Sequence, residues 1–238
     1  MAQLLEPNSE TWDYYISDNL KYKFVSNDFN SAWENAIRNV LMTGKQIVFG
    51  GPGEAKKAID TVQTIVLNYN AVNQILARQI HPKFPFKMVD QYTREFTQEF
   101  LDEHHEFAYL YYDRLTRDNQ INNMRINLSE QMTSGTSSNR NQMTTWIPWI
   151  DQRVSATPCL QRIKVRYEGD NTVSVIFDWR SRDLFGAWQV NLVGLIDMLQ
   201  REVTEPNECK IARIIDRNDS LHIYNSDLQA AKQVMNDA

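Results

Sequence analysis

The chain has little glycine, little proline and almost no cysteine. Its 238 residues include 8 glycines, 7 prolines and 2 cysteines, so glycine and proline together reach about half of their usual share. Collagen-like, linker-rich and low-complexity chains are thereby excluded. Because 42% of the residues are hydrophobic and 11% are aromatic, bulk disorder is excluded as well. Two cysteines cannot build a disulfide framework, and their presence favours a reducing compartment.

Positive charge and long apolar runs are also scarce. The chain has 25 basic and 30 acidic residues and a net charge of −5, whereas proteins that bind nucleic acid generally carry a basic excess. Residues 1–7 show no basic stretch followed by an apolar run. The most apolar segments, 172–177 and 190–199, are too short to cross a membrane. We therefore expect a cytoplasmic protein with no membrane partner and no specific nucleic-acid partner.

The hydrophobic pattern of the first half predicts three helices and a strand. N-cap candidates at 27–31 precede apolar residues at helical spacing, and Gly44 follows where a left-handed C-cap is expected. Residues 64–67 are β-branched and apolar enough for a strand. Apolar side chains near a period of 3.6 predict further helices over about 88–103 and 121–132.

The second half is richer in predicted strands. Residues 163–167 and 172–179 are β-prone, and the turn residues 168–171 between them indicate a hairpin. Residues 190–203 are expected to form a buried helix.

Two more strands, 212–215 and 221–224, are predicted after that helix, with a turn at 219–220 and a polar helix from about Asp227. Neither an internal repeat nor a linker divides the sequence. Because strands and helices alternate irregularly, we predict one α+β domain over residues 1–238.

Two segments resemble ligand sites superficially. Residues 50–57 lack the spacing and the Lys-Ser/Thr ending of a nucleoside triphosphate loop. As a glycine turn leading into a basic helix they could still hold one phosphate, with a plain surface turn as the alternative. Residues 102–106 contain two adjacent histidines, which point to different faces and lack metal-binding spacing. We expect a solvated helix end there and no metal site.

The two cysteines differ in their surroundings. Cys209 lies between Glu208 and Lys210 and leads into a predicted strand, so we interpret it as structural. Cys159 directly precedes the hairpin, whose return brings Arg180 close to it. A neighbouring guanidinium lowers the pKa of a thiol and increases its thiolate fraction. Cys159 is therefore the candidate nucleophile, with a structural role as the alternative.

Further polar residues follow Cys159 in a fixed order. Three motifs stand in the sequence as Thr157-Pro158-Cys159, Arg180-Ser181-x-Asp183-x7-Asn191 and His222-x-Tyr224. Together they resemble the motifs of the thymidylate synthase family in order and nearly in spacing. The form Arg-Ser-x-Asp-Leu-Phe-Gly is similar to the short archaeal-type or phage-type branch. The resemblance covers residues 105–225 well, and the first hundred residues are divergent.

The resemblance implies a thymidylate synthase-like α+β fold, a mixed sheet packed with helices, in a homodimer. It also implies methylation of dUMP to dTMP with 5,10-methylenetetrahydrofolate or a methylene-tetrahydropterin analogue. Cys159 would add to C6 of the pyrimidine, and Tyr111 would assist removal of the C5 proton. Asp183 would bond the pterin ring. Glu95, with Glu99 as the other candidate, would order water at O4.

The resemblance also assigns the contacts to the nucleotide. Arg180 and Ser181 would bind the 5′-phosphate, which Arg140 would reach from the partner subunit. Asn191 would hydrogen-bond N3–H and O4 of the pyrimidine, which favours uracil because related enzymes for cytosine often carry Asp there. His222 and Tyr224 would contact the sugar hydroxyl.

Departures from the family pattern keep two alternatives open. Asn139 stands where the family has a second arginine, Trp179 replaces a frequent glutamine, and residues 233–238 lack an apolar tail. One alternative is transfer of a hydroxymethyl group to C5 of dUMP, dCMP, UMP or CMP, in which water replaces hydride at the last step. The other is a non-catalytic relative that binds a nucleotide or its own messenger RNA, against which the retained Cys159 argues.

Overall fold

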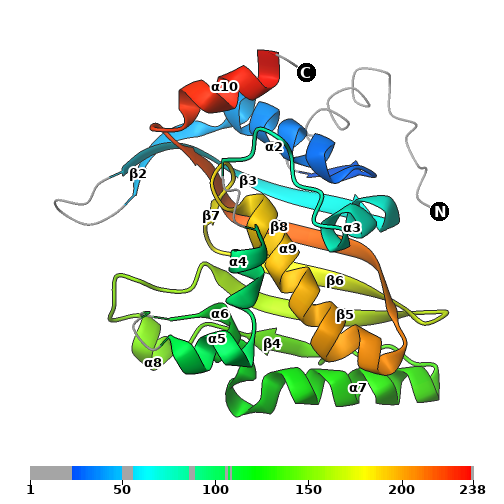
Figure 1. The fold of residues 1–238 in the computed structure, drawn as a ribbon. Coiled ribbons are helices and arrows are strands. Elements are labelled where there is room, and N and C mark those ends of the chain that lie inside the picture. The colour runs from blue at the N-terminus through cyan, green and yellow to red at the C-terminus, as the bar shows by residue number, and fades with distance from the viewer. Residues whose placement is uncertain (1–22, 50–55, 86–88, 105–106, 108, 237–238) are drawn as a thin grey trace, which may run out of the picture.

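Figure 1 shows a mixed sheet with helices packed against it, in a computed structural model that describes residues 23–49, 56–85, 89–104, 107 and 109–236. Within these residues eight strands form the sheet, in the order β1-β3-β8-β6-β5-β4, with β2 paired to β3 and β7 paired to β8. This is the predicted α+β class with a mixed sheet. The strands are β1 (Lys23–Ser26), β2 (Lys45–Phe49), β3 (Lys56–Asn68), β4 (Gln142–Thr144), β5 (Leu160–Gly169), β6 (Thr172–Trp179), β7 (Arg182–Asp183) and β8 (Lys210–Tyr224).

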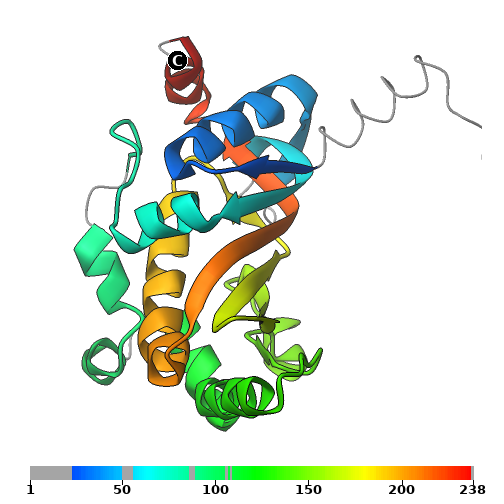
Figure 2. The ribbon, with the colours of Figure 1, turned by 90° about the vertical axis from the view of Figure 1, so that its right-hand side faces the viewer.

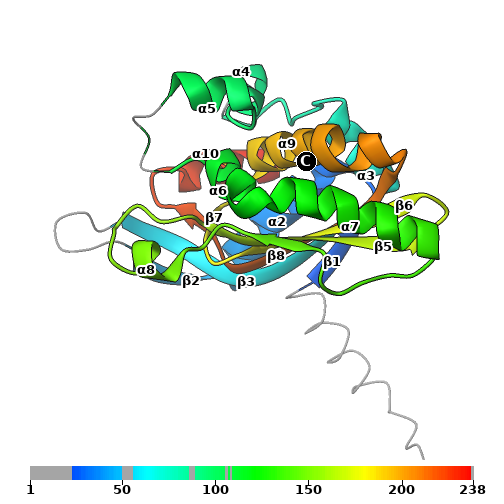
Figure 3. The same cartoon turned by 90° about the horizontal axis from the view of Figure 1, so that it is seen from below.

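The described helices lie on one face of the sheet, apart from the short α8 near its edge (Figure 3). A π-helical turn, Gln200–Thr204, extends α9. No helix in the described ranges is both long and apolar enough to cross a bilayer. The helices are α2 (Phe29–Thr43), α3 (Tyr69–Leu76), α4 (Val89–Arg94), α5 (Gln98–Glu103), α6 (Tyr111–Thr116), α7 (Gln120–Ser134), α8 (Pro148–Asp151), α9 (Trp188–Leu199) and α10 (Leu228–Asn236).

Strand β8 shows how the sheet divides its two faces. Figure 2 shows its long, curved course, and it pairs with β3 on one side and with β6 on the other. Ile214, Asp216 and Asn218 are buried, whereas Arg213, directly before them, and Arg217 are exposed. Because side chains alternate along a strand, the first set faces the helices and the second faces away. The helix-covered face therefore contains buried polar groups as well as the apolar core.

Helix α2 begins where the sequence predicts and ends for a different reason. The Asp28 side chain caps it by accepting a hydrogen bond from the Ser31 N–H at 2.7 Å. Gly44 follows the last helical residue, but its φ of −69° is not left-handed, so that expectation is wrong. A Cβ at this position would lie 2.5 Å from both Ile59 Cγ2 and the Val40 carbonyl oxygen. Close approach to β3 therefore requires the glycine.

The predicted helix over 88–103 is two helices, so this prediction is wrong in its continuity. α4 ends at Arg94 and α5 begins at Gln98, while Met88 lies outside the described residues. The Thr97 hydroxyl accepts a hydrogen bond from the Phe100 N–H at 3.2 Å and so caps α5. An N-cap residue has extended backbone and interrupts a helix. The apolar period continues across the break because both helices bury their apolar side chains.

The predicted turn at 219–220 does not exist, and the two expected strands are one. β8 runs without a break from Lys210 to Tyr224. Its register against β3 shifts between the pairs Thr61–Leu221 and Gln63–Asn218. Asp219 and Ser220 therefore form a β-bulge, which accommodates polar residues inside a strand that remains paired.

The other predicted elements are confirmed. β5 and β6 form the hairpin, and Gly169, Asp170 and Asn171 at its turn have positive φ angles of 96°, 47° and 52°. The strand at 64–67 lies in β3, and the helices at 121–132, at 190–203 and after Asp227 correspond to α7, α9 and α10.

In the segment 50–57, residues 50–55 lie outside the described residues. Lys56 and Lys57 begin β3, so the basic helix expected there is a strand.

Candidate functional site

Cys159, Arg180, Asp183 and His222 come together at one end of the sheet. β6 and β8 are parallel, and β5, which follows Cys159, starts where β6 ends. Leu160 pairs with Trp179, and Asp183 pairs with His222. We refer to this region, made of Cys159, residues 179–183, Asn191 and residues 218–224, as the Cys159 end of the sheet. Carboxyl ends of parallel strands commonly hold ligand sites in α/β folds.

The Cys159 thiol is partly buried among groups of both signs. Burial raises its pKa above the ordinary value, while the guanidinium groups of Arg180 and Arg182 and a hydrogen bond from Ser181 oppose that shift. The effect of Arg180 thus has the predicted direction. Because burial has the larger effect, the expected net lowering of the pKa is wrong, and the thiol form predominates at neutral pH.

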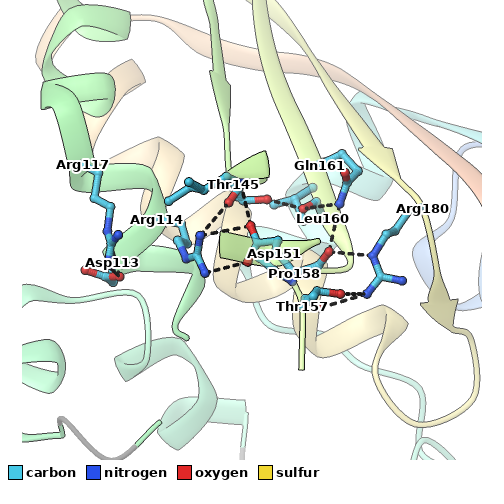
Figure 4. Close-up of polar contacts among 11 residues, drawn as sticks. Asp113, Arg114, Arg117, Thr145, Asp151, Thr157, Pro158, Leu160, Gln161 and Arg180 are labelled. Carbon is cyan, nitrogen blue, oxygen red and sulfur yellow. Dashed lines mark hydrogen bonds and ion pairs between the residues drawn. The ribbon is translucent and has the colours of Figure 1, made fainter. Parts of the chain in front are cut away.

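The Arg180 side chain is turned toward the loop that precedes Cys159 (Figure 4). Its backbone N–H donates to the Cys159 carbonyl oxygen at 3.0 Å. Its guanidinium donates to the carbonyl oxygens of Pro158 and Thr157, both at 3.0 Å, and to the Thr157 hydroxyl at 2.5 Å. Arg180 therefore lies beside Cys159, as expected, and holds the backbone of the Thr-Pro-Cys motif.

A second set of contacts fixes the other side of Cys159. The Thr145 hydroxyl donates to the Leu160 carbonyl oxygen (Figure 4). Arg114 donates to the Thr145 carbonyl oxygen at 3.5 Å and forms a buried ion pair with Asp151 at 2.9 Å. The residue that follows Cys159 is thus anchored to a buried charged pair, which restrains the position of the thiol.

Tyr111 lies against the same backbone. Its hydroxyl accepts a hydrogen bond from the Leu160 N–H at 3.4 Å. Burial raises the pKa of Tyr111 well above the ordinary value, and the neighbouring Tyr109 adds to that shift. The Tyr111 ring also meets Trp179 edge-on, with 6.0 Å between the ring centroids. Tyr111 is therefore a neutral phenol beside Cys159.

Asn191 lies in the first turn of α9 and is buried. Its side-chain amide donates to the hydroxyl of Tyr92 on α4. Burial raises the pKa of Tyr92 far above its ordinary value, so this phenol is also neutral. The contact fixes the orientation of the Asn191 amide, which can then donate and accept in defined directions.

Asp183 directs its carboxylate into a tight turn. The carboxylate accepts a hydrogen bond from the Gly186 N–H at 2.9 Å, and burial raises the pKa of Asp183. A Cβ at position 186 would lie 2.5 Å from Asp183 Oδ2. A carboxylate has about four acceptor sites, and the backbone N–H groups of Gly186 and Phe185 bond to this one.

His222 and Tyr224 lie on one face of β8, with 4.8 Å between their ring centroids. His222 is 2% exposed, and burial lowers its pKa to about 4. Its Nδ1 lies 3.4 Å from the Ser220 hydroxyl, while its buried Nε2 has no hydrogen-bond partner among the described residues. A neutral imidazole with an unpartnered nitrogen is suited to a ligand that offers a hydroxyl group.

The two glutamate candidates differ in environment. Glu95 lies between α4 and α5, partly buried, and burial raises its pKa. Its charge also acts on Tyr92, which bonds Asn191. Glu99 is exposed and lies 3.9 Å from Arg94. Of the two carboxylates, only Glu95 interacts with the described groups around Asn191.

Arg140 does not join the other site residues within its own chain. It is exposed, and the neighbouring Asn141 carbonyl oxygen accepts a hydrogen bond from the Val165 N–H at 3.1 Å. The strand from Cys159 to Val165 spans about 20 Å at the usual rise per residue. Arg140 therefore lies far from Cys159.

Arg182, Tyr92 and Tyr109 also belong to the site, although none of them stands at a fixed position of the three motifs. Arg182 occupies the variable position inside the Arg-Ser-x-Asp motif. Because side chains alternate along a strand, its place directly before Asp183 could have indicated that it points to the opposite side. Tyr92 appeared only as one residue of an apolar period. Nothing in the sequence marks Tyr109 as a neighbour of Cys159.

Metal-ligating side chains do not cluster in the parts of the chain that the structure describes, where no group of three or more His, Cys, Asp or Glu could hold an ion. Of the predicted helix end at 102–106, α5 ends at Glu103 and His104 stacks on Phe100 at 3.9 Å, while residues 105–106 lie outside the described residues.

Comparison with known proteins finds relatives along nearly the whole chain. No family model matches the sequence. The chain is 24% identical over 225 residues to a protein named "Putative thymidylate synthase" from Methanothermobacter marburgensis, across 91% of this chain and 99% of that protein. It is 22% identical over 223 residues, with the same coverage, to the protein of that name from Methanothermobacter thermautotrophicus. With the protein of that name from Methanosarcina mazei it shares 30% identity over 132 residues, 55% of this chain and 59% of the relative.

The resemblance to the thymidylate synthase family that the motifs indicate is thus confirmed. The two alignments that span 91% of the chain also extend into the first hundred residues. The similarity there is therefore wider than the motifs alone suggest.

Proposed function

We propose that this protein methylates dUMP to dTMP at C5, with Cys159 as the nucleophile. The observation that carries the proposal is the convergence of the Cys159 thiol, Arg180, Asn191 and His222 on one end of the sheet. The similarity of nearly the whole chain to proteins named as thymidylate synthases supports it. A binding protein has no need of a partly buried thiol flanked by two arginines.

Cys159 activates a carbon that is otherwise unreactive. C5 of a uracil ring is a poor nucleophile until a thiolate adds to C6. The sulfur forms a bond to C6, and the electron pair of the C5–C6 double bond moves toward C5 and O4. C5 would then bond to the one-carbon unit that a carrier supplies, and loss of the C5 proton would go with cleavage of the bond between that carbon and the carrier. Hydride from the carrier would complete the methyl group, the C5–C6 double bond would re-form, and the electron pair of the C6–S bond would return to Cys159 as a thiolate. Covalent catalysis of this kind divides one difficult step into easier ones.

Arg180 and Ser181 would hold the 5′-phosphate. An arginine presents paired N–H donors that match two phosphate oxygens. In the structure those donors bind backbone oxygens of Thr157 and Pro158. Exchange of these acceptors for a phosphate would couple nucleotide binding to the loop that carries Cys159.

Asn191 would recognise the pyrimidine and stabilise the charge on O4. Its amide can donate to O4 and accept from N3–H, the pattern of uracil and not of cytosine. The contact with Tyr92 supports this role because it fixes the amide orientation. His222 and Tyr224 would contact the sugar hydroxyl, for which the unpartnered Nε2 of His222 is suited.

Tyr111 and Glu95 would handle the C5 proton. Burial keeps Tyr111 neutral, so it would act through its hydroxyl hydrogen bond rather than as a phenolate. The raised pKa of Glu95 makes this carboxyl a better proton acceptor than an exposed glutamate. Glu95 would order water near O4 and accept protons through it.

Asp183 fits the pterin ring of the one-carbon carrier. We propose 5,10-methylenetetrahydrofolate, or a methylene-tetrahydropterin analogue, which when bound supplies the one-carbon unit and the hydride of the last step. The amino group and the adjacent ring N–H of a pterin are donors, and the Asp183 carboxylate retains acceptor sites beyond those that the N–H groups of Gly186 and Phe185 occupy. This donor and acceptor match supports the assignment.

A homodimer would explain the position of Arg140. Because Arg140 lies about 20 Å from Cys159 along β5, it would reach a phosphate only at the site of a second copy. The face of the sheet away from the helices offers an apolar row, in which Val25 pairs with Val66, Val66 with Ile215 and Ile215 with Ile176. Val25 is 58% exposed, so this row is open at one end.

Tritium release tests the reaction. Incubation with dUMP tritiated at C5 and methylenetetrahydrofolate is expected to release tritium together with the absorbance of dihydrofolate. Release without dihydrofolate indicates hydroxymethyl transfer instead. UMP, dCMP and CMP, also tritiated at C5, serve as comparison substrates. If none of the four nucleotides releases tritium, both forms of the enzymatic proposal are contradicted.

Subunit complementation tests the dimer. Cys159→Ser and Arg140→Ala chains, each weakly active alone, are mixed after unfolding and refolded together. A mixed dimer contains one site with both Cys159 and the partner's Arg140, so activity is expected to reappear. If the mixture is no more active than its components, Arg140 does not act across subunits.

A further inference from the structure

Arg182 connects three elements beneath the Cys159 end of the sheet. It is 2% exposed and lies on β7. Its Nη1 lies 3.3 Å from Asp216 Oδ1 on β8, and its Nη2 donates to the Trp188 carbonyl oxygen on α9 at 3.0 Å. The guanidinium carbon lies 3.5 Å from the centroid of the Trp179 ring at the end of β6. The side chain is therefore fixed in one position without help from solvent.

Asp216 is itself fully engaged. One of its carboxylate oxygens accepts hydrogen bonds from Trp188 Nε1 at 2.8 Å and from Asn218 Nδ2 at 3.0 Å. The other oxygen faces Arg182. Only one carboxylate oxygen of Asp216 contacts the guanidinium, at 3.3 Å, so the pair is neutral as a whole but has a positive end and a negative end. The buried Nε of Arg182 has no hydrogen-bond partner in the described part of the chain.

The positive side of this pair is directed toward the reactive residues. Arg182 lowers the pKa of Cys159, and it also interacts electrostatically with Tyr111 and Tyr92. Trp179, on which Arg182 stacks, pairs in the sheet with Leu160, the residue after Cys159, and meets the ring of Tyr111. The remaining groups that act on the thiol are Arg180, Ser181, Asp183, Tyr109, Tyr111 and Tyr224.

Arg180 and Arg182 differ in what a nucleotide would do to their charge. Arg180 is partly exposed, and under the proposed function it binds a phosphate whose negative charge offsets its own. Arg182 is enclosed by Trp179, Trp188 and Asp216, and its two terminal nitrogens already face protein oxygens, so we assign it no phosphate contact. In a low-dielectric interior a fixed charge acts strongly on its neighbours. Its charge is therefore the one that persists beside the sulfur when substrate is bound.

We propose that Arg182 is a positioning residue that supplies the permanent positive charge next to Cys159, and that Asp216 limits how much of this charge reaches the sulfur. The proposal rests on the proposed function only in taking Cys159 as the nucleophile. It assigns a role to the variable position of the Arg-Ser-x-Asp motif and to a buried ion pair to which the proposed function gives no contact with the nucleotide or the carrier.

The pH dependence of Cys159 alkylation tests this proposal. Iodoacetamide reacts with the thiolate, and peptide mass spectrometry distinguishes Cys159 from Cys209. Arg182→Gln is expected to raise the midpoint of the pH profile of Cys159 alkylation by about one pH unit. This shift corresponds to about tenfold less thiolate at neutral pH. Asp216→Asn is expected to lower the midpoint by about half a unit, or about threefold more thiolate. Arg182→Lys, which keeps the charge, is expected to stay closer to the wild type than Arg182→Gln.

Shifts of the alkylation midpoint in opposite directions for Arg182→Gln and Asp216→Asn distinguish an electrostatic role from a structural one. Arg114→Gln is the matched control, because Arg114 forms a second buried pair of this kind within the described residues, with Asp151. An unchanged midpoint in Arg182→Gln overturns the proposal, and so does an equal rise in Arg114→Gln. If a thermal melt shows that Arg182→Gln is not folded, Asp216→Asn decides the question. An alkylation midpoint of Asp216→Asn at or above that of the wild type then overturns the proposal.

The alkylation profile needs no nucleotide and no carrier. Loss of tritium release in the wild-type protein would therefore contradict the proposed function without affecting this test. Conversely, an active enzyme whose Cys159 midpoint ignores Arg182 and Asp216 would contradict only the present inference.

Discussion

The two ends of the sheet each hold a cysteine, Cys159 partly buried and Cys209 buried, and charged groups shift the thiol pKa only of Cys159. At the opposite end, which we call the Cys209 end, β6 and β8 begin and the Gly169–Asn171 turn joins β5 to β6. There the Cys209 thiol lies 3.2 Å from the Met132 sulfur, and burial raises its pKa with no opposing group. At the Cys159 end, burial also raises the thiol pKa, but two arginines and a serine hydroxyl oppose it.

This difference shows that burial alone does not make a reactive thiol. Strand direction decides which end collects the charged groups. Because β6 and β8 are parallel and are followed by polar loops or residues, Arg180, Asp183 and His222 all arrive at the end where β5 begins. At the Cys209 end, the Gly169–Asn171 turn and the contact of Cys209 with Met132 take the place of these polar residues. The interpretation of Cys209 as a structural residue agrees with its burial against Met132.

Substitution of each cysteine gives the largest expected contrast. Cys159→Ser is expected to lower tritium release from dUMP by at least about 10³-fold, because a serine hydroxyl is a far weaker nucleophile than a thiolate. Binding of dUMP, measured by calorimetry, should change little. Cys209→Ser is expected to stay within about twofold of the wild-type rate. Equal losses in both variants would mean that neither end holds the nucleophile.

Acid is expected to destabilise the protein through the Cys159 end. The pKa of His222 is about 4 in the folded protein and about 6.5 when unfolded, so the unfolded chain binds a proton first. Stability is therefore fully present above about pH 6.5 and falls toward pH 4, by up to about 3 kcal/mol. Denaturant unfolding of wild type and His222→Phe at pH 7, 5.5 and 4 measures the difference. A wild-type protein that loses no more stability than His222→Phe would show that His222 titrates normally.

The phosphate is expected to distinguish Arg180 from other exposed arginines. Arg180→Ala should raise the KM for dUMP about 30-fold, because it removes a charge-assisted pair with the phosphate. Arg117→Ala is the control: Arg117 is exposed on the neighbouring surface, where it pairs with Asp113 at 2.7 Å (Figure 4). Its KM should remain within about twofold. If both variants behave alike, Arg180 does not bind the phosphate.

Two glycines give the smallest effects and separate stability from activity. Gly169→Ala, at the Cys209 end, is expected to cost about 1 kcal/mol because its φ of 96° disfavours a side chain, with kcat and KM unchanged. Gly186→Ala, at the Cys159 end, should displace the Asp183 carboxylate, which lies 2.5 Å from the new Cβ. We expect a severalfold higher KM for the carrier with little loss of stability. Thermal unfolding and steady-state kinetics on both variants check this, and the reverse pattern would contradict the assignment of Asp183.

Local sequence signals identified most elements and failed where tertiary pairing decides. The β5–β6 hairpin and α9 follow from turn residues and from continuous hydrophobicity. Asp219 and Ser220 look like a turn in sequence, but pairing with β3 and β6 keeps β8 continuous and absorbs them as a bulge. Thr97 interrupts an apolar period that otherwise reads as one helix.

The site shows the same limit. Motif order alone indicated Cys159, Arg180, Asp183 and His222, and the strand pairings bring these residues to one end of the sheet. The direction in which the pKa of Cys159 shifts could not be predicted from the sequence, because the burial of its thiol depends on chain segments that are distant from Cys159 in the sequence. For the same reason Arg182 and Tyr92 became visible only through contacts with residues 34 and 99 positions away in the sequence.

Covalent trapping is the most direct test that Cys159 adds to a pyrimidine. In 5-fluoro-dUMP the fluorine at C5 cannot leave as a proton does, so a reaction that passes through addition at C6 and transfer to C5 should stop with the sulfur still bonded to C6. After incubation with methylenetetrahydrofolate and digestion, mass spectrometry is expected to find the nucleotide and the carrier on the peptide that contains Cys159. An adduct on the Cys209 peptide, or no adduct from a preparation that releases tritium from dUMP, would contradict the account.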